Sequence, residues 1–307
     1  MGTSDFAVPG LRALLQSLRY DVVAVVTQPD RPVGRKRVMT PPPVKVVAES
    51  AAIPVLQPEK ARDSEFISAI ESLRADIAIV ASYGQILKQR LLDAPRFGCL
   101  NIHGSLLPKY RGASPIQSAI LNGESETGVT IMQMDVGLDT GDMISKVSTP
   151  IRDDDTAQSL HDRLADLGGT LLLETLPKVL AGQAEPEKQS DAEATHVGKI
   201  QREDGLIDWK RPAREIWNQA RAFDPWPGAF STVKDFGEIR IWKCHLAEEA
   251  LNGAPGNVVV KDDQFMVICG EGALVIDELQ KQGSRRMLTR DFLAGARLPE
   301  GAQFELE

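Results

Sequence analysis

One stretch of the sequence, residues 99 to 142, concentrates the side chains that could do chemistry. It begins with CLNIH (99–103), whose apolar character predicts the end of a buried strand. Because side chains alternate across a strand, Asn101 and His103 are expected to project to the same face. An amide and an imidazole placed together can donate hydrogen bonds to a developing oxyanion. A core histidine beside a capping asparagine is the commoner explanation for so short a motif.

A third polar group follows in the loop DVGLDTGDM (135–143). The chain leaves the first strand through Gly104 and reaches a predicted helix at Pro115, whose ring suits a first helical turn. The segment GVTIMQMD (128–135) predicts another strand, and the acidic loop after it can return Asp139 toward the end of the first strand. Asn101, His103 and Asp139 are therefore the candidate catalytic residues.

These motifs resemble those of a known family. The trio, together with SLLP (105–108) and GLDTGD (137–142), resembles the 10-formyltetrahydrofolate-dependent formyltransferases. Within that superfamily the sequence is most similar to the methionyl-tRNA formyltransferases, because further segments outside the catalytic core also match. These segments are GTSDFAVP (2–9), TQPDRPVGR (27–35), PPPVK (41–45), ASYGQIL (81–87) and RAFDPWPGAF (221–230).

The resemblance implies transfer of a formyl group from 10-formyltetrahydrofolate to the amino group of methionyl initiator tRNA, by direct amine attack through a tetrahedral intermediate. In that reaction Asn101 and His103 would stabilise the oxyanion, and Asp139 would orient His103 and accept a proton. Formyl transfer to an amino sugar or small amine, hydrolysis of formylfolate, and noncatalytic tRNA binding remain alternatives.

By position, the resemblance also assigns contacts to the folate co-substrate. The residues are Ser105, Leu106, Leu107 and Pro108, with Tyr83, Gly84, Gln85, Ile86 and Leu87 at the edge of the pterin pocket. Backbone groups of irregular loops can bind a flat donor and acceptor ring such as a pterin. Ordinary core packing is an equal alternative for Tyr83 and Ile86.

The composition is that of a soluble globular protein. Of the 307 residues, 42% are hydrophobic and 25% charged, and no apolar run approaches the roughly 20 residues of a membrane span. We therefore expect a cytoplasmic protein that acts as a monomer. Cys99, Cys244 and Cys269 are scattered and are expected to pack in the core, and with four dispersed histidines they suggest no metal site.

Basic residues gather in two acid-free stretches, although the net charge of −8 argues against indiscriminate nucleic-acid binding. A solvated surface is the plainer explanation for such stretches. The resemblance instead assigns the first to the acceptor end of the tRNA, and we expect the second to contact tRNA as well. The first stretch holds Arg31, Arg35, Lys36, Arg37 and Lys45, and the second holds Lys281, Arg285, Arg286 and Arg290.

Alternating strand and helix patterns predict a doubly wound, Rossmann-like α/β domain over residues 1–182, with its site at the carboxyl ends of the strands. Apolar runs at 21–27 and 76–82 predict strands buried in a parallel sheet, and 63–74 predicts a helix. A leucine stripe at Leu160, Leu164, Leu167 and Leu171 predicts a helix packed on that sheet. The family begins with an apolar strand before GTSDFAVP, so we expect the first strand to be missing and the start to be misassigned or the chain shortened.

The remainder predicts a linker and a second domain. Residues 183–202 are polar without sustained apolar periodicity, which is typical of a linker. Short alternating segments from 203 to 307 predict a small antiparallel β-barrel, OB-like, that contacts tRNA. Trp226 lies between two prolines and is expected to pack between elements rather than stack on a base.

Overall fold

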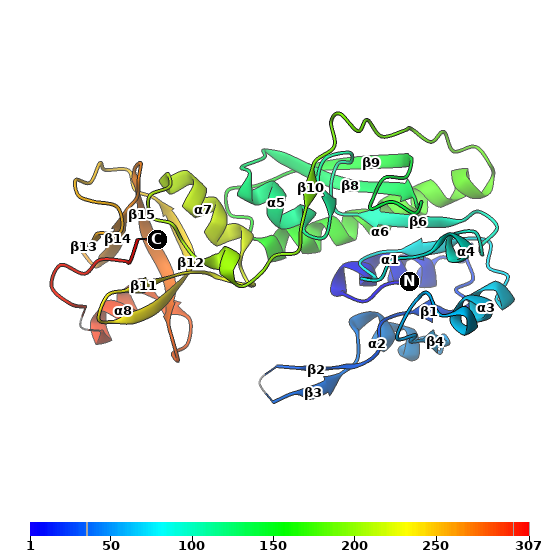
Figure 1. The fold of residues 1–307 in the computed structure, drawn as a ribbon, viewed down its shortest axis with the longest axis horizontal. Helices are drawn as coiled ribbons and strands as arrows, with labels where there is room; N and C mark the ends of the chain where they lie inside the picture. The colour runs from blue at the N-terminus through cyan, green and yellow to red at the C-terminus, as the bar shows by residue number, and fades with distance from the viewer. Residues whose placement is uncertain (35, 297, 307) are drawn as a thin grey trace. The chain divides into compact units, whose positions relative to one another are not determined.

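The computed structural model describes residues 1–34, 36–296 and 298–306. The chain divides into two compact units (Figure 1). The first unit comprises Met1–Pro115, Glu126–Pro150 and His161–Val197, and the second comprises Ile116–Ser125, Ile151–Leu160 and Gly198–Glu307.

The first unit has the Rossmann-like α/β fold that the sequence predicts. β1 pairs in parallel with β4, and β5 pairs in parallel with β6, while β8 and β9 extend the sheet in antiparallel order. Its helices are η1 (Asp5–Ala7), α1 (Val8–Gln16), α2 (Pro43–Ser50), α3 (Ser64–Ser72), α4 (Gln89–Leu92) and most of α6 (Ala157–Leu180). Its strands are β1 (Val25–Val26), β2 (Arg31–Val33), β3 (Val38–Thr40), β4 (Val55–Leu56), β5 (Ala78–Val80), β6 (Cys99–His103), β7 (Arg111–Gly112), β8 (Glu126–Gln133), β9 (Met143–Pro150) and β10 (His196–Val197).

Two helices lie close against Ile102 in the middle of β6. A Cβ at Gly168 of α6 would come within 2.7 Å of one methyl of Ile102, and a Cβ at Gly10 of α1 within 3.1 Å of the other. A side chain at Gly168 would force Ile102 to shift, and one at Gly10 would crowd it, so both helices pack tightly on the sheet. Leu164 and Leu171 of the predicted stripe are buried, which confirms the packing expected of this helix.

The first residues of the chain lie between β1 and β5. Gly2 N donates to Val26 O at 2.9 Å, and Ala81 N donates to Met1 O at 3.0 Å. Beyond them a cavity of about 520 Å³ opens, lined by residues 19–26 and 73–79 and by apolar side chains of α1 and α6. β1 and β5 are shorter than the predicted strands at 21–27 and 76–82, because no strand among the described residues pairs with their first halves on the cavity side.

The second unit is built on an antiparallel sheet with the order β11-β12-β15-β14-β13, which confirms the predicted class of this domain. The terminal segment joins both edges of the sheet, because Val258 N donates to Ala302 O at 3.0 Å and Glu305 N donates to Thr232 O at 2.8 Å. Its strands are β11 (Ala229–Val233), β12 (Gly237–Leu246), β13 (Val258–Lys261), β14 (Gln264–Ile268), β15 (Ala273–Lys281) and β16 (Met287–Leu288). Its helices are most of α5 (Pro115–Leu121), η2 (Glu203–Gly205), α7 (Ala213–Ala222) and α8 (Thr289–Gly295).

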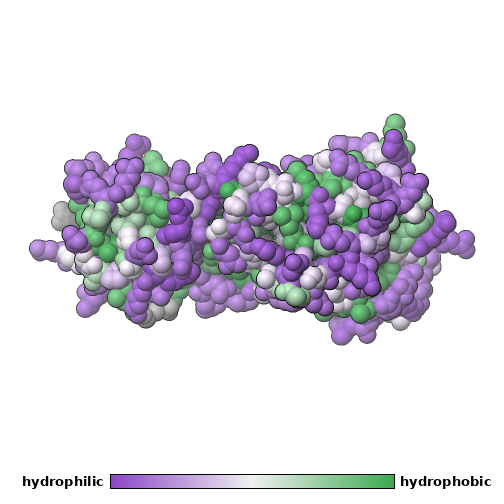
Figure 2. Space-filling model, turned by 90° about the horizontal axis from the view of Figure 1, so that it is seen from above, coloured by the Kyte–Doolittle hydropathy of each residue, from purple (hydrophilic) through white to green (hydrophobic). Residues whose placement is uncertain are grey.

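The surface shown in Figure 2 is mostly hydrophilic, and the three cysteines are buried. On this face, hydrophobic residues form patches between the hydrophilic ones. None of the helices in residues 1–34, 36–296 and 298–306 is long and apolar enough to cross a membrane. Cys99, Cys244 and Cys269 are buried free thiols, which confirms their predicted core positions, and burial raises the pKa of Cys99 to about 11.

Candidate active site

The carboxyl ends of the parallel strands β5 and β6 meet at the edge where the candidate catalytic residues lie. β6 ends at His103, with Asn101 two residues earlier on the same strand, and the two residues are only 6% and 8% exposed. β5 leads directly into residues 81–87. Ligands of open α/β sheets bind at the carboxyl ends of the strands, so this edge is the candidate active site.

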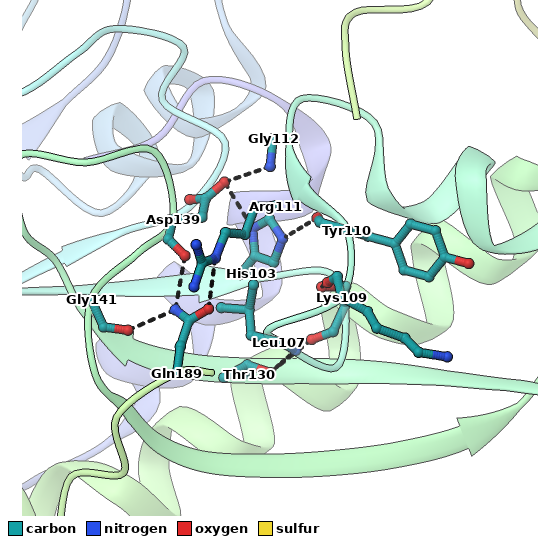
Figure 3. A network of polar contacts seen from close by, with 11 residues as sticks. His103, Leu107, Lys109, Tyr110, Arg111, Gly112, Thr130, Asp139, Gly141 and Gln189 are labelled. Atoms are coloured by element: carbon teal, nitrogen blue, oxygen red, sulfur yellow. Dashed lines mark hydrogen bonds and ion pairs between the residues drawn. The ribbon is translucent and has the colours of Figure 1, made fainter. Parts of the chain in front are cut away.

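His103 lies between a backbone carbonyl and a carboxylate (Figure 3). Its Nε2 is 2.9 Å from Tyr110 O, and its Nδ1 is 3.7 Å from Asp139 Oδ2. Because a carbonyl oxygen only accepts, Nε2 must carry a proton, which leaves Nδ1 as the ring nitrogen that can gain or lose one. At 3.7 Å the imidazole and the carboxylate are close without sharing a direct hydrogen bond. The structure thus brings these two residues together, and their catalytic roles stay predictions.

Asp139 occupies a tight loop between β8 and β9. Its φ of +54° lies in the left-handed region, which aspartate tolerates better than most residues. Its Oδ2 accepts a hydrogen bond from Gly112 N at 2.8 Å. Two residues later a Cβ on Gly141 would lie 1.8 Å from Gln133 O, so only glycine allows the loop to pass so close to β8. Backbone packing therefore determines where the carboxylate lies.

Asn101 is the member of the trio whose side chain is left available. Its backbone is paired on both sides, with Val80 in β5 and Met132 in β8. Within the described ranges its side-chain amide has no hydrogen-bond partner. A nearly buried amide of this kind is suited to bind a carbonyl or oxyanion that reaches the site.

The SLLP segment is fixed against β8. Thr130 Oγ1 donates to Ser105 O at 2.7 Å and accepts from Leu107 N at 3.1 Å. Ser105 and Leu107 are buried, whereas Leu106 and Pro108 are partly exposed. The segment is therefore a rigid part of the site edge, and its contacts with folate stay a prediction.

The other segment assigned to folate is divided between core and surface. Tyr83 and Leu87 are 2% and 4% exposed and belong to the core, whereas Ile86 is 83% exposed. Burial raises the pKa of Tyr83 to about 12, and its hydroxyl has no hydrogen-bond partner among the described residues. Gln85 Oε1 accepts from Ala61 N at 2.7 Å, and Gly84 has a φ of +81°. Core packing accounts for two of these residues, and Ile86 is free to contact a ligand.

The stretch predicted as a linker contributes to the site through Gln189. Its Nε2 donates to Asp139 O at 2.8 Å and to Gly141 O at 2.7 Å, and its Oε1 accepts from Arg111 Nε at 2.9 Å (Figure 3). Sequence reasoning missed both Gln189 and Arg111, because a polar stretch without periodicity gives no sign of its distant partners.

Of the first group of basic residues, Arg31, Lys36 and Arg37 lie on the hairpin formed by β2 and β3, drawn in blue in Figure 1. Lys45 lies in α2 instead and is paired with Asp30 at 2.9 Å. Lys36 and Arg37 are exposed at the turn of the hairpin, and Arg31 is paired with Glu59 at 2.7 Å. Arg35, the arginine assigned most directly to tRNA, lies outside the described residues. An exposed basic hairpin suits contact with phosphates.

The second basic group is partly neutralised. Arg286 is paired with Glu278 at 2.6 Å and with Asp224 at 3.1 Å, and Lys281 Nζ lies 3.7 Å from the centre of the Phe236 ring. Arg285 is exposed. Contact with an anion therefore suits Arg285 better than Arg286, whose charge is already compensated.

Trp226 is 56% exposed, so the expectation that it packs between elements is wrong. The prolines on either side lack the N–H groups that would tie this segment into a strand or helix, and the segment stays at the surface.

Two family comparisons match most of the chain. Residues 1–176 match the formyl transferase family, and residues 199–297 match the formyl transferase C-terminal domain. The chain is 51% identical over 302 residues to a methionyl-tRNA formyltransferase of Geobacter metallireducens, covering 98% of this chain and 96% of the relative. It is 46% identical over 303 residues to that of Bacillus subtilis, covering 98% and 95%.

Solved structures support the same fold at low sequence identity. A sugar 3N-formyl transferase, WlaRD, crystallised with dTDP and 5-N-formyl-THF, has a TM-score of 0.68 at 22% identity and covers 92% of this chain and 97% of its own. HypX from Aquifex aeolicus, in complex with tetrahydrofolic acid, has a TM-score of 0.58 at 22% identity and covers 80% of this chain and 43% of its own.

The fold and the site edge define an enzyme of the formyl transferase class. The chain belongs to the formyl transferase family and, by its near full-length identity to them, to the methionyl-tRNA formyltransferases.

Proposed function

We propose that this enzyme transfers the formyl group of 10-formyltetrahydrofolate to the amino group of methionyl initiator tRNA, in the cytoplasm and as a monomer. The observation that carries the proposal is the edge of β6, where the His103 ring faces the Asp139 carboxylate at 3.7 Å and Asn101 lies on the same strand. The relatives that match along nearly the whole chain bear the name of this activity, which supports the choice of substrate.

The reaction needs donors for an oxyanion and a path for protons. Attack of the neutral amine on the formyl carbon forms a carbon–nitrogen bond and places negative charge on the formyl oxygen. The Asn101 amide donates to that oxygen. Nδ1 of His103 and the Asp139 carboxylate take the proton that the amine loses and return one to N10 of the folate as its bond to the formyl carbon breaks. The atoms balance without a metal and without a covalent enzyme intermediate.

The folate co-substrate fits the residues at the ends of β5 and β6. Asn101 offers an amide that has no partner among the described residues, and Ile86 offers an exposed apolar side chain. Residues 83–87 and 105–108 would contact the pterin. The co-substrate supplies the activated formyl carbon, and the protein supplies its orientation.

The acceptor is the tRNA rather than an amino sugar, and the basic hairpin of β2 and β3 supports this choice. Its turn carries Lys36 and Arg37 in exposed positions that suit a phosphate backbone. We propose that Arg31, Arg35, Lys36 and Arg37 contact the acceptor end of the tRNA, with Arg285 and its neighbours Lys281 and Arg286 as a second contact.

Incubation of the purified chain with 10-formyltetrahydrofolate labelled in the formyl group tests the proposal. The expected result is label in methionyl initiator tRNA, with little in a parallel reaction that offers an amino sugar nucleotide. If label appeared in the sugar alone, the acceptor would be an amino sugar and the proposed tRNA acceptor would be wrong. Release of free formate at the same rate with and without tRNA would identify a hydrolase instead.

A further inference from the structure

A polar segment at residues 187–197, which we call the strap, fastens the two loops that carry the site. At one end Glu187 and Met143 exchange two backbone hydrogen bonds of 2.8 Å, next to the loop that holds Asp139. At the other end β10 pairs in parallel with β7, next to the loop that follows His103. The strap therefore reaches both sides of the pair formed by His103 and Asp139.

Gln189 is the third residue of the strap, and its side-chain amide forms three hydrogen bonds there. Its two N–H groups donate to the carbonyl oxygens of Asp139 and Gly141, and its oxygen accepts from Arg111 Nε. An amide offers two donors and one oxygen, so a single side chain ties the Asp139 loop to the loop after β6 (Figure 3).

Arg111 anchors this arrangement from the other loop. Its side chain is 3% exposed, and its Nη1 is paired with Asp191 of the strap at 3.0 Å. Its backbone N donates to Thr195 O at 2.8 Å. A guanidinium that is buried and held in this way offers a fixed position to the oxygen of Gln189.

The strap also reaches the partner of the imidazole. Tyr110 N donates to Thr195 Oγ1 at 2.7 Å, and the carbonyl of Tyr110 is the group that accepts from His103 Nε2. The strap thus binds the backbone of Tyr110, whose carbonyl accepts from His103. Through Gln189 it also holds the loop that carries Asp139, whose carboxylate faces the His103 ring.

We propose that Gln189 is a positioning residue that sets the place of the Asp139 carboxylate relative to His103. Asp139 is 3.7 Å from the ring and is not bonded to it, so its distance depends on the backbone of its own loop. Gln189 acts on that backbone through the carbonyls at both ends of a three-residue turn. Its hydrogen bonds among the described residues go to two backbone carbonyls and to Arg111 rather than to the imidazole or the carboxylate, and its effect on catalysis rests on the proposed function of the site.

Two substitutions of Gln189 distinguish the effect of its amide hydrogen bonds from the effect of its size. Gln189→Ala removes all three hydrogen bonds, and Gln189→Glu keeps the size and the acceptor for Arg111 but turns a carboxylate oxygen toward two carbonyls. We expect each to lower kcat for formyl transfer by about tenfold to a hundredfold, because small displacements of catalytic groups have effects of that size. KM for tRNA and for the folate should change by less than about threefold. Lys188→Ala, an exposed neighbour on the strap, is the matched control and should leave kcat within about twofold.

The position of Asp139 can also be followed without any substrate. Gly112 N donates to Asp139 Oδ2 at 2.8 Å, so exchange of the Gly112 amide hydrogen reports whether the carboxylate has moved. We expect faster exchange at Gly112 in both Gln189 variants and parent-like exchange in Lys188→Ala. Unchanged exchange at Gly112, or kcat within twofold of the parent in the Gln189→Glu protein, would overturn the inference. A parent protein without activity on methionyl tRNA would refute the proposed function, and the exchange measurement would still test the role of Gln189.

Discussion

Two edges of the first unit differ in what lies around their buried polar groups. At the end of β6, the imidazole of His103 and the carboxylate of Asp139 each have a partner, and the loops around them are tied together by the strap. Between β1 and β5, the Met1 amine donates to Ile79 O at 2.6 Å beside a cavity of about 520 Å³. Hydrogen bonds tie the loops together at the first edge, whereas a cavity lies beside the second.

The difference indicates that the two edges have different roles: the first fixes the groups of the candidate site, and the second affects the stability of the domain. Hydrogen bonds at the end of β6 fix the groups to which the proposed mechanism assigns the reaction. At the cavity edge the Met1 residue is partly exposed, but its amine lies inside, and burial lowers the pKa of this ammonium to about 6. We therefore expect substitutions at the first edge to change activity, and changes at the second to change the free energy of unfolding.

The largest effect is expected from substitutions at the end of β6, and it should be a loss of activity. His103→Ala and Asn101→Ala, made separately, should each lower kcat/KM by about a hundredfold to a thousandfold, roughly 3–4 kcal/mol of barrier, because in the proposed mechanism each removes a group that stabilises the transition state. Steady-state formylation of methionyl tRNA measures this. His245→Ala in the second unit, where the ring is exposed, should behave like the parent protein. Activity within tenfold of the parent in either variant would remove that residue from the proposed mechanism.

The buried Met1 amine beside the cavity should make the free energy of unfolding depend on pH. The folded state binds a proton at the Met1 amine with a pKa of about 6, whereas the ordinary pKa of this group is 8.0, so between these values the unfolded state binds more protons. Stability from this group is therefore fully present above pH 8 and is lost as pH falls toward 6, by up to about 3 kcal/mol and less where water enters the cavity.

Urea unfolding between pH 6 and 8 measures this dependence in protein whose mass shows an intact Met1. A form acetylated at the Met1 amine carries no charge there and serves as the control. The acetylated protein should lose the part of the pH dependence that this amine contributes. Identical slopes for the two forms would show that the amine is not buried.

The sequence alone predicts contacts between residues that are close along the chain better than contacts between distant ones. Asn101 and His103 are neighbours on one strand, so alternation predicts their shared face, and turn residues predict that Asp139 returns toward them. Gln189 could not be found in this way, since its partners lie 50 and 48 residues away and no periodicity marks them. The lengths of β1 and β5 depend on which strands pair with them, and the apolar character of a segment does not predict its pairing.

The smallest effect is expected where basic residues are exposed rather than paired. Lys36→Ala with Arg37→Ala on the hairpin should raise KM for tRNA by about threefold to tenfold and leave kcat and KM for the folate within about twofold, because exposed charges act mainly on binding and are screened by salt. Lys60→Ala with Arg62→Ala removes the same charge from other exposed positions of the first unit and is the matched control. Formylation rates at several salt concentrations should show a weaker salt dependence of KM in the hairpin variant than in the control. Equal changes in the two double variants would show that net charge alone acts on the tRNA, and a fall in kcat of the hairpin variant comparable with that of His103→Ala would place the hairpin in the chemical step.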